Sequence, residues 1–428
     1  MKKLFLLLAL VAMFASGCEK DSDDSGTNNP TEQPGDNGNG GNNDNGDNNG
    51  DDDNGDDDVN NDNNGDDNGN GSNDDDGNNG GNNPSGLPKP KANEIYYTTT
   101  DGVALDLGGK GFYSTVSSHS IKNGNIFVLT FMQDLSLISE SIEISFEDAQ
   151  KLQTIRLPEG FQKIRNNTFY DCRSLTSITL PESVTFIGSS AFCFCYSLTN
   201  IIIPKGVTYI GSYAFHACDS LPYITIPENV TSIGNYAFSS CESLPSITIP
   251  DSVTSIGEYA FRGCSSVTNV TISEGVTSIG AYAFSGCTGE LIINSKQLVE
   301  TNYTNYSNWL NGSSFTKVTI CDKVTKIGNY AFYGCSSLTS ITIPEGVTSI
   351  GEYAFSGCSS LTNVTISEGV TSIEGYAFSG CRSLTSITIP EGVTSIGRYA
   401  FSDCSSLTSI TIPEGVTEIG GSAFSDCI

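Results

Sequence analysis

The sequence predicts a β-rich repeat solenoid, and a recurring motif, a constant spacing and a constant apolar pattern lead to this prediction. The motif at residues 338–358, LTSITIPEGVTSIGEYAFSGC, recurs with small changes down the C-terminal two thirds of the chain. Cysteines mark its register and lie 23 residues apart within two runs, which are Cys172, Cys195, Cys218, Cys241, Cys264 and Cys287, and then Cys335, Cys358, Cys381, Cys404 and Cys427. Self-similarity at a fixed period is typical of a stacked array of small structural units.

The apolar residues of one unit indicate how it folds. Leu338, Ile341 and Ile343 fit a strand, and the two isoleucines point to the same side because they lie two positions apart. Pro344 cannot donate a hydrogen bond to a neighbouring strand, so it ends this one. The chain then returns, and we expect a short helical turn over residues 353–357. A period in the twenties with this order of elements is typical of leucine-rich repeats with parallel strands.

The domain organisation follows from the need for neighbours. One unit buries too few apolar side chains to offset the entropy lost on ordering it, so stacking must create the core. We expect the solenoid over residues 152–428, with an irregular repeat at 288–320, where the spacing between Cys287 and Cys335 lengthens to 48. Residues 92–151 depart from the repeat and contain strand-like runs. They are expected to form a small N-terminal β cap that covers the first unit.

The first residues are typical of an exported protein. Lys2 and Lys3 precede an apolar run, and residues 15–18 then read Ala-Ser-Gly-Cys, which resembles a bacterial lipobox. We therefore expect a signal peptide over residues 1–17 and lipidation of Cys18, whose acyl chains would be the chain's contact with the membrane. The alternative is an ordinary cleaved signal followed by an incidental cysteine.

The segment that follows, residues 18–88, is predicted to be a disordered linker. Residues 21–80 hold 18 aspartates and Glu32 but no Lys or Arg, and so carry 19 of the 29 net negative charges. Almost no apolar residue is present to form a core, so the segment would act as a tether. Its aspartates and asparagines could associate loosely with calcium, but they do not complete an EF-hand loop. The absence of a basic stripe argues against a nucleic-acid partner.

The strand positions that face away from the core form two columns, which begin at Ser177 and Thr179. Hydroxyl and amide side chains dominate these columns, so the face could hydrogen-bond a protein or a glycan over a long surface. Ile202, Tyr223 and Lys317 interrupt the pattern and are the favoured contacts. The alternative is that small and β-branched residues simply suit a flat sheet. The candidate partner-binding residues on this face are Ile202, Tyr223, Ser246, Asn269, Thr271, Lys317, Ser340, Thr342 and Asn363.

The irregular repeat carries three aromatic residues, Tyr303, Tyr306 and Trp309, in an Asn-rich stretch. One interpretation is that they replace the missing Val, Ile and Phe of the core. The other is that they form an aromatic contact site for a glycan or a protein, since insertions in solenoids often carry binding.

Catalysis, cofactors and metals find little support in the sequence. The two histidines, His119 and His216, lie apart from any nucleophile motif or carboxylate pair, so we expect no enzyme and no cofactor. The register cysteines would stand side by side about 5 Å apart at Cβ, farther than the ~3.8 Å that a disulfide prefers. We expect buried free thiols that act as small apolar side chains and hold no zinc. Cys193 and Cys321 fall outside the column and are better candidates for redox behaviour.

The repeat, L-x-x-I-x-I-P-x-x-V-x-x-I-G-x-x-A-F-x-x-C, resembles the BspA-like bacterial cell-surface leucine-rich repeats. The residues that show it in full are Leu384, Ile387, Ile389, Pro390, Val393, Ile396, Gly397, Ala400, Phe401 and Cys404. The resemblance implies a lipoprotein or a secreted surface protein engaged in adhesion. Together with the lipobox it leads us to expect a lipid-anchored protein of the cell outer membrane that is exposed at the surface. Implied partners are host extracellular-matrix or cell-surface proteins, or the surfaces of other bacteria. The resemblance assigns no ligand residue.

Three functions therefore stay open at this point. The first is an adhesin or interaction scaffold that binds through the repeat surface. The second is a glycan-binding lipoprotein for nutrient capture, and the third is a structural protein of a surface coat or biofilm.

Overall fold

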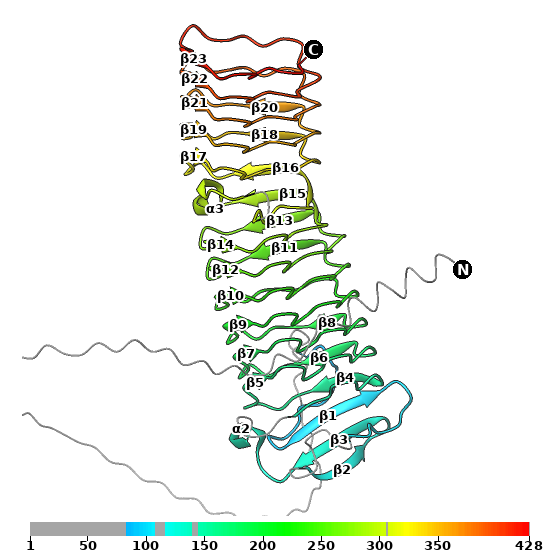
Figure 1. The fold of residues 1–428 in the computed structure, drawn as a ribbon. Helices are drawn as coiled ribbons and strands as arrows, with labels where there is room; N and C mark the ends of the chain where they lie inside the picture. Colours follow the sequence, from blue (N-terminus) through cyan, green and yellow to red (C-terminus); the bar gives the residue numbers. More distant parts are fainter. Residues whose placement is uncertain (1–82, 108–115, 139–143, 305–306, 428) are drawn as a thin grey trace, which may run out of the picture. The chain divides into compact units, whose positions relative to one another are not determined.

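The computed structural model describes residues 83–427 apart from 108–115, 139–143 and 305–306 (Figure 1). The predicted signal peptide, the lipidation site Cys18 and nearly all of the predicted linker lie outside the described residues. Within the described ranges, no helix combines the length and the apolar character needed to cross a membrane.

An antiparallel sheet begins the described fold, and the first coils of the solenoid extend it. Its members are β1 (Glu94–Thr99), β2 (Val116–Lys122) and β3 (Ile126–Phe131), followed by the short α2 (Leu135–Ile138). Strand β1 pairs antiparallel with β3 on one side and with β4 (Leu152–Arg156) on the other. Strand β4 then pairs in parallel with β6 (Ser177–Thr179), and β6 pairs in parallel with β8 (Asn200–Ile201). Residues 94–131 therefore cover the edge that the first coil would otherwise expose.

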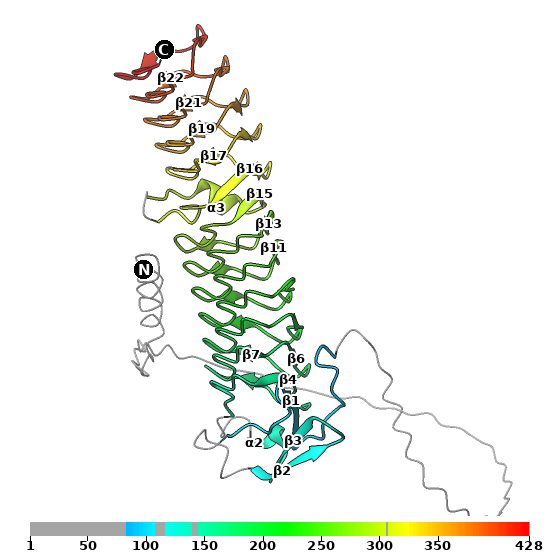
Figure 2. The same cartoon turned by 90° about the vertical axis from the view of Figure 1, so that its right-hand side faces the viewer.

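The strands of the solenoid lie on two faces, and Figures 1 and 2 show the coils stacked one upon the next. We call the face with the longer strands the strand face; it comprises β4, β6 (Ser177–Thr179), β8 (Asn200–Ile201), β11 (Ser246–Ile249), β13 (Asn269–Ile272), β15 (Thr288–Ile293), β16 (Ser314–Ile320), β18 (Ser340–Thr342) and β20 (Asn363–Thr365). The second face comprises β5 (Lys163–Ile164), β7 (Phe186–Ile187), β9 (Tyr209–Ile210), β10 (Ser232–Ile233), β12 (Ser255–Ile256) and β14 (Ser278–Ile279), and then β17 (Lys326–Ile327), β19 (Ser349–Ile350), β21 (Ser372–Ile373), β22 (Ser395–Ile396) and β23 (Glu418–Ile419). The predicted parallel β solenoid is confirmed.

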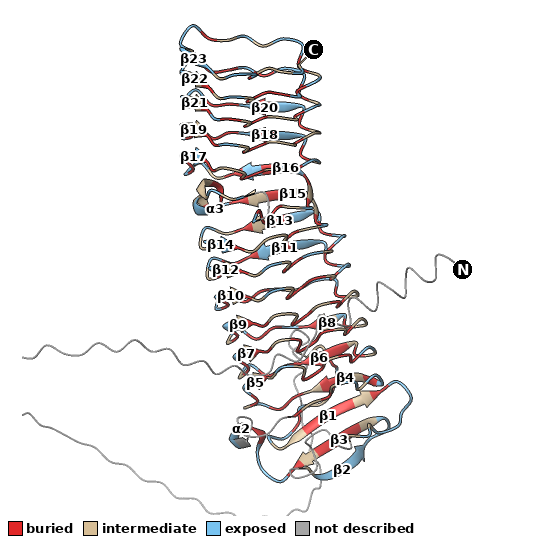
Figure 3. Cartoon of the chain, viewed as in Figure 1, coloured by how far each residue is buried: buried red, intermediate tan, exposed pale blue. Residues whose placement is uncertain are grey.

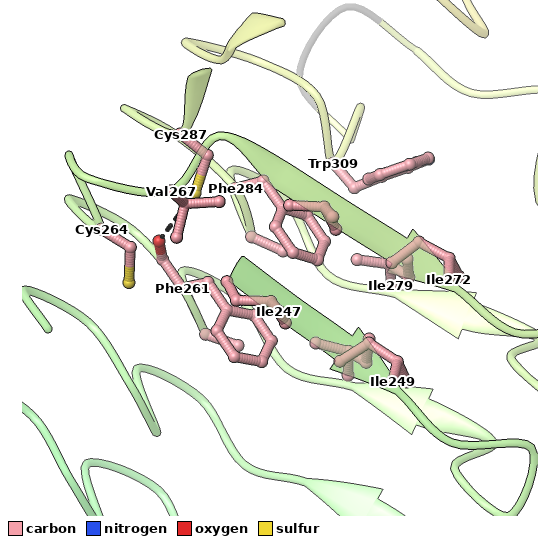
Figure 4. Packing of buried hydrophobic residues seen from close by; sticks show 14 of the residues in the cluster. Ile247, Ile249, Phe261, Cys264, Val267, Ile272, Ile279, Phe284, Cys287 and Trp309 are labelled. Carbon is pink, nitrogen blue, oxygen red and sulfur yellow. Dashed lines mark hydrogen bonds between the residues drawn. The ribbon is translucent and has the colours of Figure 1, made fainter. Parts of the chain in front are cut away.

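The register of the strands places equivalent residues of successive coils on one another. Ile247 pairs with Val270 and Ile249 with Ile272, so the inward apolar side chains form continuous columns (Figure 4). A column of phenylalanines runs through the core with ring centroids 5.2 Å apart between Phe261 and Phe284. Exposed and buried residues alternate along β11, because every second side chain enters this core, and Figure 3 colours the described residues by their burial.

The predicted helical turn at residues 353–357 is wrong, and the hydrogen bonding explains why. Tyr353 has a left-handed backbone, φ 56°, which a right-handed helix cannot contain. Alternate N–H groups instead donate to the following coil, Phe355 to the Ala377 carbonyl at 2.8 Å and Gly357 to the Ser379 carbonyl at 2.8 Å. The segment is a third ladder between coils, and the N–H groups that a helix needs are already used.

The irregular repeat contains α3 (Lys296–Glu300), whose N-cap Ser295 accepts a hydrogen bond from the Leu298 N–H. Trp309 is only 1% exposed and contacts Phe284 edge to face, with ring centroids 5.8 Å apart (Figure 4). The indole thus occupies the core next to the end of the phenylalanine column. This corrects the expectation that Trp309 faces a ligand, because a ring in the core cannot do so.

The first outward residues of the strand face are also not where the sequence placed them. Ser177 and Thr179 are buried, and residues 83–85 lie against Thr179. The Ser85 N–H and hydroxyl both contact the Thr179 hydroxyl, at 3.1 and 2.7 Å. The end of the predicted linker is therefore part of the folded unit, and the open strand face begins one coil later than predicted.

Candidate functional site

The strand face is interrupted at residues 222–226, and we attribute this interruption to two prolines. In neighbouring coils a threonine N–H holds the start of the strand, as Thr199 donates to the Thr176 carbonyl at 2.9 Å. Pro222 and Pro245 occupy this position in the next two coils and have no N–H to donate. Residues 222–226 form no strand, and within the described part of the chain we find no backbone hydrogen bond to or from them.

This cause can be tested by restoring the missing donors. We expect the double variant Pro222→Thr and Pro245→Thr to form the absent rungs, each contributing about 0.5–1.5 kcal/mol. Hydrogen exchange at the Ile224 amide should slow by about tenfold or more, since a net gain of ~1.4 kcal/mol corresponds to a factor of ten. Unchanged exchange at Ile224 would show that the prolines do not cause the interruption.

A hollow of about 690 Å³ opens at the interruption, where the strands of three neighbouring coils turn the corner. Its lining residues are Glu182, Ile201, Ile202, Ile203, Lys205, Tyr223, Thr225, Ile226, Pro227, Glu228 and Asn229. Ile202 is 37% exposed and Tyr223 is 54% exposed, and both are large side chains with substantial apolar surface. The Tyr223 hydroxyl donates to Oδ1 of Asn200 at 3.2 Å, which ties this side chain to the preceding coil. The structure thus brings two of the three favoured sequence candidates together in one apolar hollow.

The third favoured candidate, Lys317, lies in a different environment. Its ammonium is 2.6 Å from Oε1 of Glu290 in the adjacent strand β15. With Ser340 and Thr342 it lines a smaller hollow of about 240 Å³. Because the charge of Lys317 is paired within the chain, this side chain offers a partner less electrostatic attraction than an unpaired lysine would.

The other polar candidates occupy contiguous outward positions. Ser246 lies opposite Asn269, and Thr271 follows two residues later on β13. Ser340 lies between Lys317 and Asn363 on neighbouring strands. They form the hydroxyl and amide rows that the sequence predicts, and Ser246, Asn269, Ser340, Thr342 and Asn363 are exposed. No large apolar side chain breaks the surface among them.

Two of the three predicted aromatic contact residues, Trp309 and Tyr303, lie among the described residues, and neither is openly exposed. Besides the buried Trp309, Tyr303 is half-buried, and its hydroxyl donates to the Leu298 carbonyl at 3.0 Å. Burial raises the pKa of Tyr303 to about 12. Tyr306 lies outside the described residues. The described aromatics therefore match the interpretation in which they replace missing core side chains.

A column of stacked tyrosines runs along the turn edge of the coils. This second aromatic feature was not among the predictions from the sequence. Its two runs are Tyr213, Tyr236, Tyr259 and Tyr282, and then Tyr330, Tyr353, Tyr376 and Tyr399, with ring centroids 4.6–5.3 Å apart. All eight have left-handed backbones, which bulky residues rarely adopt. The repeated tyrosine before Ala-Phe was the signal in the sequence. Because the rings cover each other's faces, the column presents mainly edges and hydroxyls.

The cysteine column consists of free thiols, as predicted, but these thiols also donate hydrogen bonds and do not act only as apolar side chains. The Cys264 thiol donates to the Phe238 carbonyl at 3.2 Å and the Cys287 thiol to the Phe261 carbonyl at 3.4 Å, the latter drawn in Figure 4. Burial raises the pKa of Cys335 to about 12, which disfavours the reactive thiolate. Cys193 is fully buried, which corrects its choice as a redox candidate, whereas Cys321 is half-buried.

Asp219 is a carboxylate outside the hollow whose pKa is raised. Partial burial, and to a lesser degree the neighbouring carboxylate of Glu242, raise the pKa of Asp219 to about 6. The folded-state pKa thus lies above the unfolded value, so the folded state binds more protons between about pH 4 and 6 and stability falls as pH rises through this window. We expect Asp219→Asn to raise the melting temperature at pH 7 and to leave it unchanged at pH 4. An equal shift at both pH values, measured by thermal unfolding, would contradict this.

The histidines lie in separate environments. His216 is largely buried, with Nδ1 3.1 Å from the Ser239 carbonyl, and burial lowers its pKa. His119 lies on β2, where it contacts the Tyr97 hydroxyl. Among the residues that the structure describes, no group of three His, Cys, Asp or Glu side chains could hold a metal ion.

Comparison with known proteins supports the repeat assignment. The family model described as "BspA type Leucine rich repeat region (6 copies)" matches residues 114–244, 185–311 and 302–428. Solved structures with similarity include a leucine-rich repeat protein from Bacteroides ovatus, with 27% identity over 72% of this chain and 83% of that chain and a TM-score of 0.46. A leucine-rich cell surface protein from Faecalibacterium prausnitzii has 39% identity over 65% of this chain and 77% of that chain, with a TM-score of 0.37.

A third similar structure is the pneumococcal vaccine antigen PcpA, with 17% identity over 66% of this chain and 78% of that chain and a TM-score of 0.35. No curated protein matches the sequence. The matched ranges together span residues 114–428 and so include the whole solenoid. The chain belongs to the BspA-type leucine-rich repeat family.

Proposed function

We propose that this protein is an adhesin of the bacterial cell surface, and that its strand face binds protein partners at the hollow formed by Ile202 and Tyr223. A family of surface repeat proteins supports an interaction scaffold in general. Three features that occur together support this position for the binding site. These are the interrupted ladder, the hollow of about 690 Å³ and two exposed large side chains on neighbouring coils.

Leaving such an apolar surface exposed to water costs free energy, which binding of a partner would recover. Exposed apolar area on a monomeric protein is often an interaction site, particularly where polar residues surround it. Glu182, Lys205 and Glu228 stand around this hollow. Tyrosine is among the residues that contribute most to protein interfaces, since its ring buries a large area and its hydroxyl stays paired. The proposed partners are host extracellular-matrix or cell-surface proteins, or surface proteins of other bacteria.

Attachment to the cell is the second part of the proposal. A lipid on Cys18 would anchor the chain in the outer membrane, and residues 21–80 would hold the solenoid away from it as an acidic tether. Mass spectrometry of the mature protein tests this part of the proposal. A first residue without the added mass of acyl chains would contradict it.

We expect the variant Ile202→Asp to lose binding, because it places a charge in an apolar contact. The full chain, displayed on bacterial cells, would be tested against immobilised matrix proteins and against co-resident bacteria. The matched control is Thr388→Asp, which changes the same outward column on a distant coil. Retention should fall by about tenfold or more for Ile202→Asp and stay near wild type for the control. Equal retention of both variants would contradict the proposed site.

A further inference from the structure

The strand face already holds one peptide segment, and its contacts show what this surface can recognise. Residues 83–91, here called the strap, lie against the outward side of the first coils. The Thr179 hydroxyl receives the Ser85 N–H at 3.1 Å and lies 3.0 Å from Oδ1 of Asn83. Arg156 donates to the Leu87 carbonyl at 2.6 Å. One outward hydroxyl, that of Thr179, and the charged side chain of Arg156 thus hold the peptide backbone.

An aliphatic side chain anchors the same segment. Leu87 is only 4% exposed and packs with Tyr96 and Val128 on the outward side of β1 and β3. Because Tyr96 supplies an aromatic ring and Val128 a branched side chain, the anchor is a small apolar cluster outside the main core. The strap therefore combines one apolar anchor with hydrogen bonds from its backbone to outward side chains.

The hollow continues this surface. Strand β6, which carries Thr179, pairs with β8, where Ile178 lies opposite Ile201. Glu182, three residues after Thr179, lines the hollow together with Ile202 and Tyr223. The coil beneath the strap is thus the direct neighbour of the hollow. The hollow also offers the same kinds of group, since it combines Tyr223, isoleucines and the outward hydroxyl of Thr225.

The charges and the apolar walls of the hollow limit which peptide segments could bind there. Two carboxylates, Glu182 and Glu228, stand at the hollow against one ammonium, Lys205. The chain's own residues 21–80 carry 18 aspartates and hold Val59 as their one aliphatic residue, so they complement neither the charge nor the apolar walls. A peptide with an aliphatic residue next to lysine or arginine complements both. In the strap itself, Leu87 is followed by Lys89 and Lys91.

We propose that the hollow binds a partner protein through a peptide segment that carries an aliphatic side chain followed by basic residues, with an apolar anchor and backbone hydrogen bonds like those that hold the strap on β1, β3, β4 and β6. The aliphatic side chain enters between Ile202 and Tyr223, and the Thr225 hydroxyl bonds the peptide backbone. This inference rests on the proposed function and adds the chemical class of the bound segment.

The probe is a fluorescein-labelled peptide with the sequence of residues 83–91, titrated against the purified full chain in detergent and followed by fluorescence anisotropy. We expect saturable binding whose dissociation constant rises at least about tenfold with Ile202→Asp in the protein. A peptide with Leu87→Ser, and another with Lys89→Glu and Lys91→Glu, should bind at least about tenfold more weakly. Thr388→Asp should leave binding unchanged.

Two outcomes would overturn the inference. If Thr179→Val weakens peptide binding and Ile202→Asp does not, the peptide exchanges with the strap and the hollow is not its site. If neutral oligosaccharides bind with the same dependence on Ile202 and the peptide does not, the occupant is a glycan. The proposed function fails separately, when Ile202→Asp leaves retention on matrix proteins and bacteria unchanged. If Ile202→Asp lowers retention but the labelled peptide does not bind the protein, only the proposed chemical class of the bound segment is wrong.

Discussion

The variant Phe261→Ala is expected to lose about 3–5 kcal/mol of unfolding free energy, the range for removing a buried phenylalanine ring. Phe261 is fully buried and stacks on Phe238 at 5.3 Å and on Phe284 at 5.2 Å. The ring is one member of a continuous column, so its removal leaves a cavity that neither neighbour can fill without leaving its own stack. Chemical denaturation followed by circular dichroism would measure the loss.

The matched control for this variant is Tyr223→Ala, which removes an aromatic ring of similar size from an exposed position. We expect a change within about 0.5 kcal/mol, as for most surface substitutions. In a repeat array each coil contacts only its neighbours, so Phe261→Ala should also split one unfolding transition into two. A single transition with a loss below about 1 kcal/mol would contradict the column as the source of stability.

The variant Trp309→Ala is expected to lose a similar amount, about 3–5 kcal/mol, and to leave ligand binding on the strand face unchanged. Trp309 is the only tryptophan and is buried against Phe284 where the regular phenylalanine column is interrupted. Removing it should increase hydrogen exchange in α3 and around residue 310, because this coil has no phenylalanine of its own at that place. The measurement is local exchange together with the melting temperature.

Its control is Tyr303→Phe, which keeps the ring and removes only the hydroxyl that donates to the Leu298 carbonyl. We expect a loss of about 1 kcal/mol for this single hydrogen bond. A glycan array would separate the two interpretations of the irregular repeat. If Trp309→Ala abolished glycan binding without lowering the melting temperature, the indole would act as a ligand contact and its burial would not describe the working state.

Much of the fold could be predicted because each coil repeats the same pattern of apolar residues, proline and cysteine. The spacing of the register cysteines, the paired isoleucines at Ile341 and Ile343 and the strand-ending Pro344 depend on local geometry alone. Stacking then follows, since one coil cannot form a core. The helical turn at 353–357 was predicted wrongly because its N–H groups bond to the next coil, a non-local contact that propensity does not include.

Less of the candidate site could be predicted. Ile202 and Tyr223 stood out because they broke a column of hydroxyls and amides, and that signal was correct as to their exposure. The hollow between them depends on Pro222 and Pro245, whose missing N–H groups matter only when neighbouring coils are aligned. Trp309 looked like a contact residue for the same reason, an aromatic among polar neighbours, and the structure buries it.

The amino-acid sequence alone determined the class of the fold, its period, its inward columns and the family, because these arise from patterns that recur within a single coil. The tertiary structure decided which outward side chains remain open. The strap covers Thr179, and the stacked tyrosines cover one another, through contacts between residues far apart in the chain. Exposure belongs to the assembled stack, since it depends on what the neighbouring coils and the strap leave uncovered.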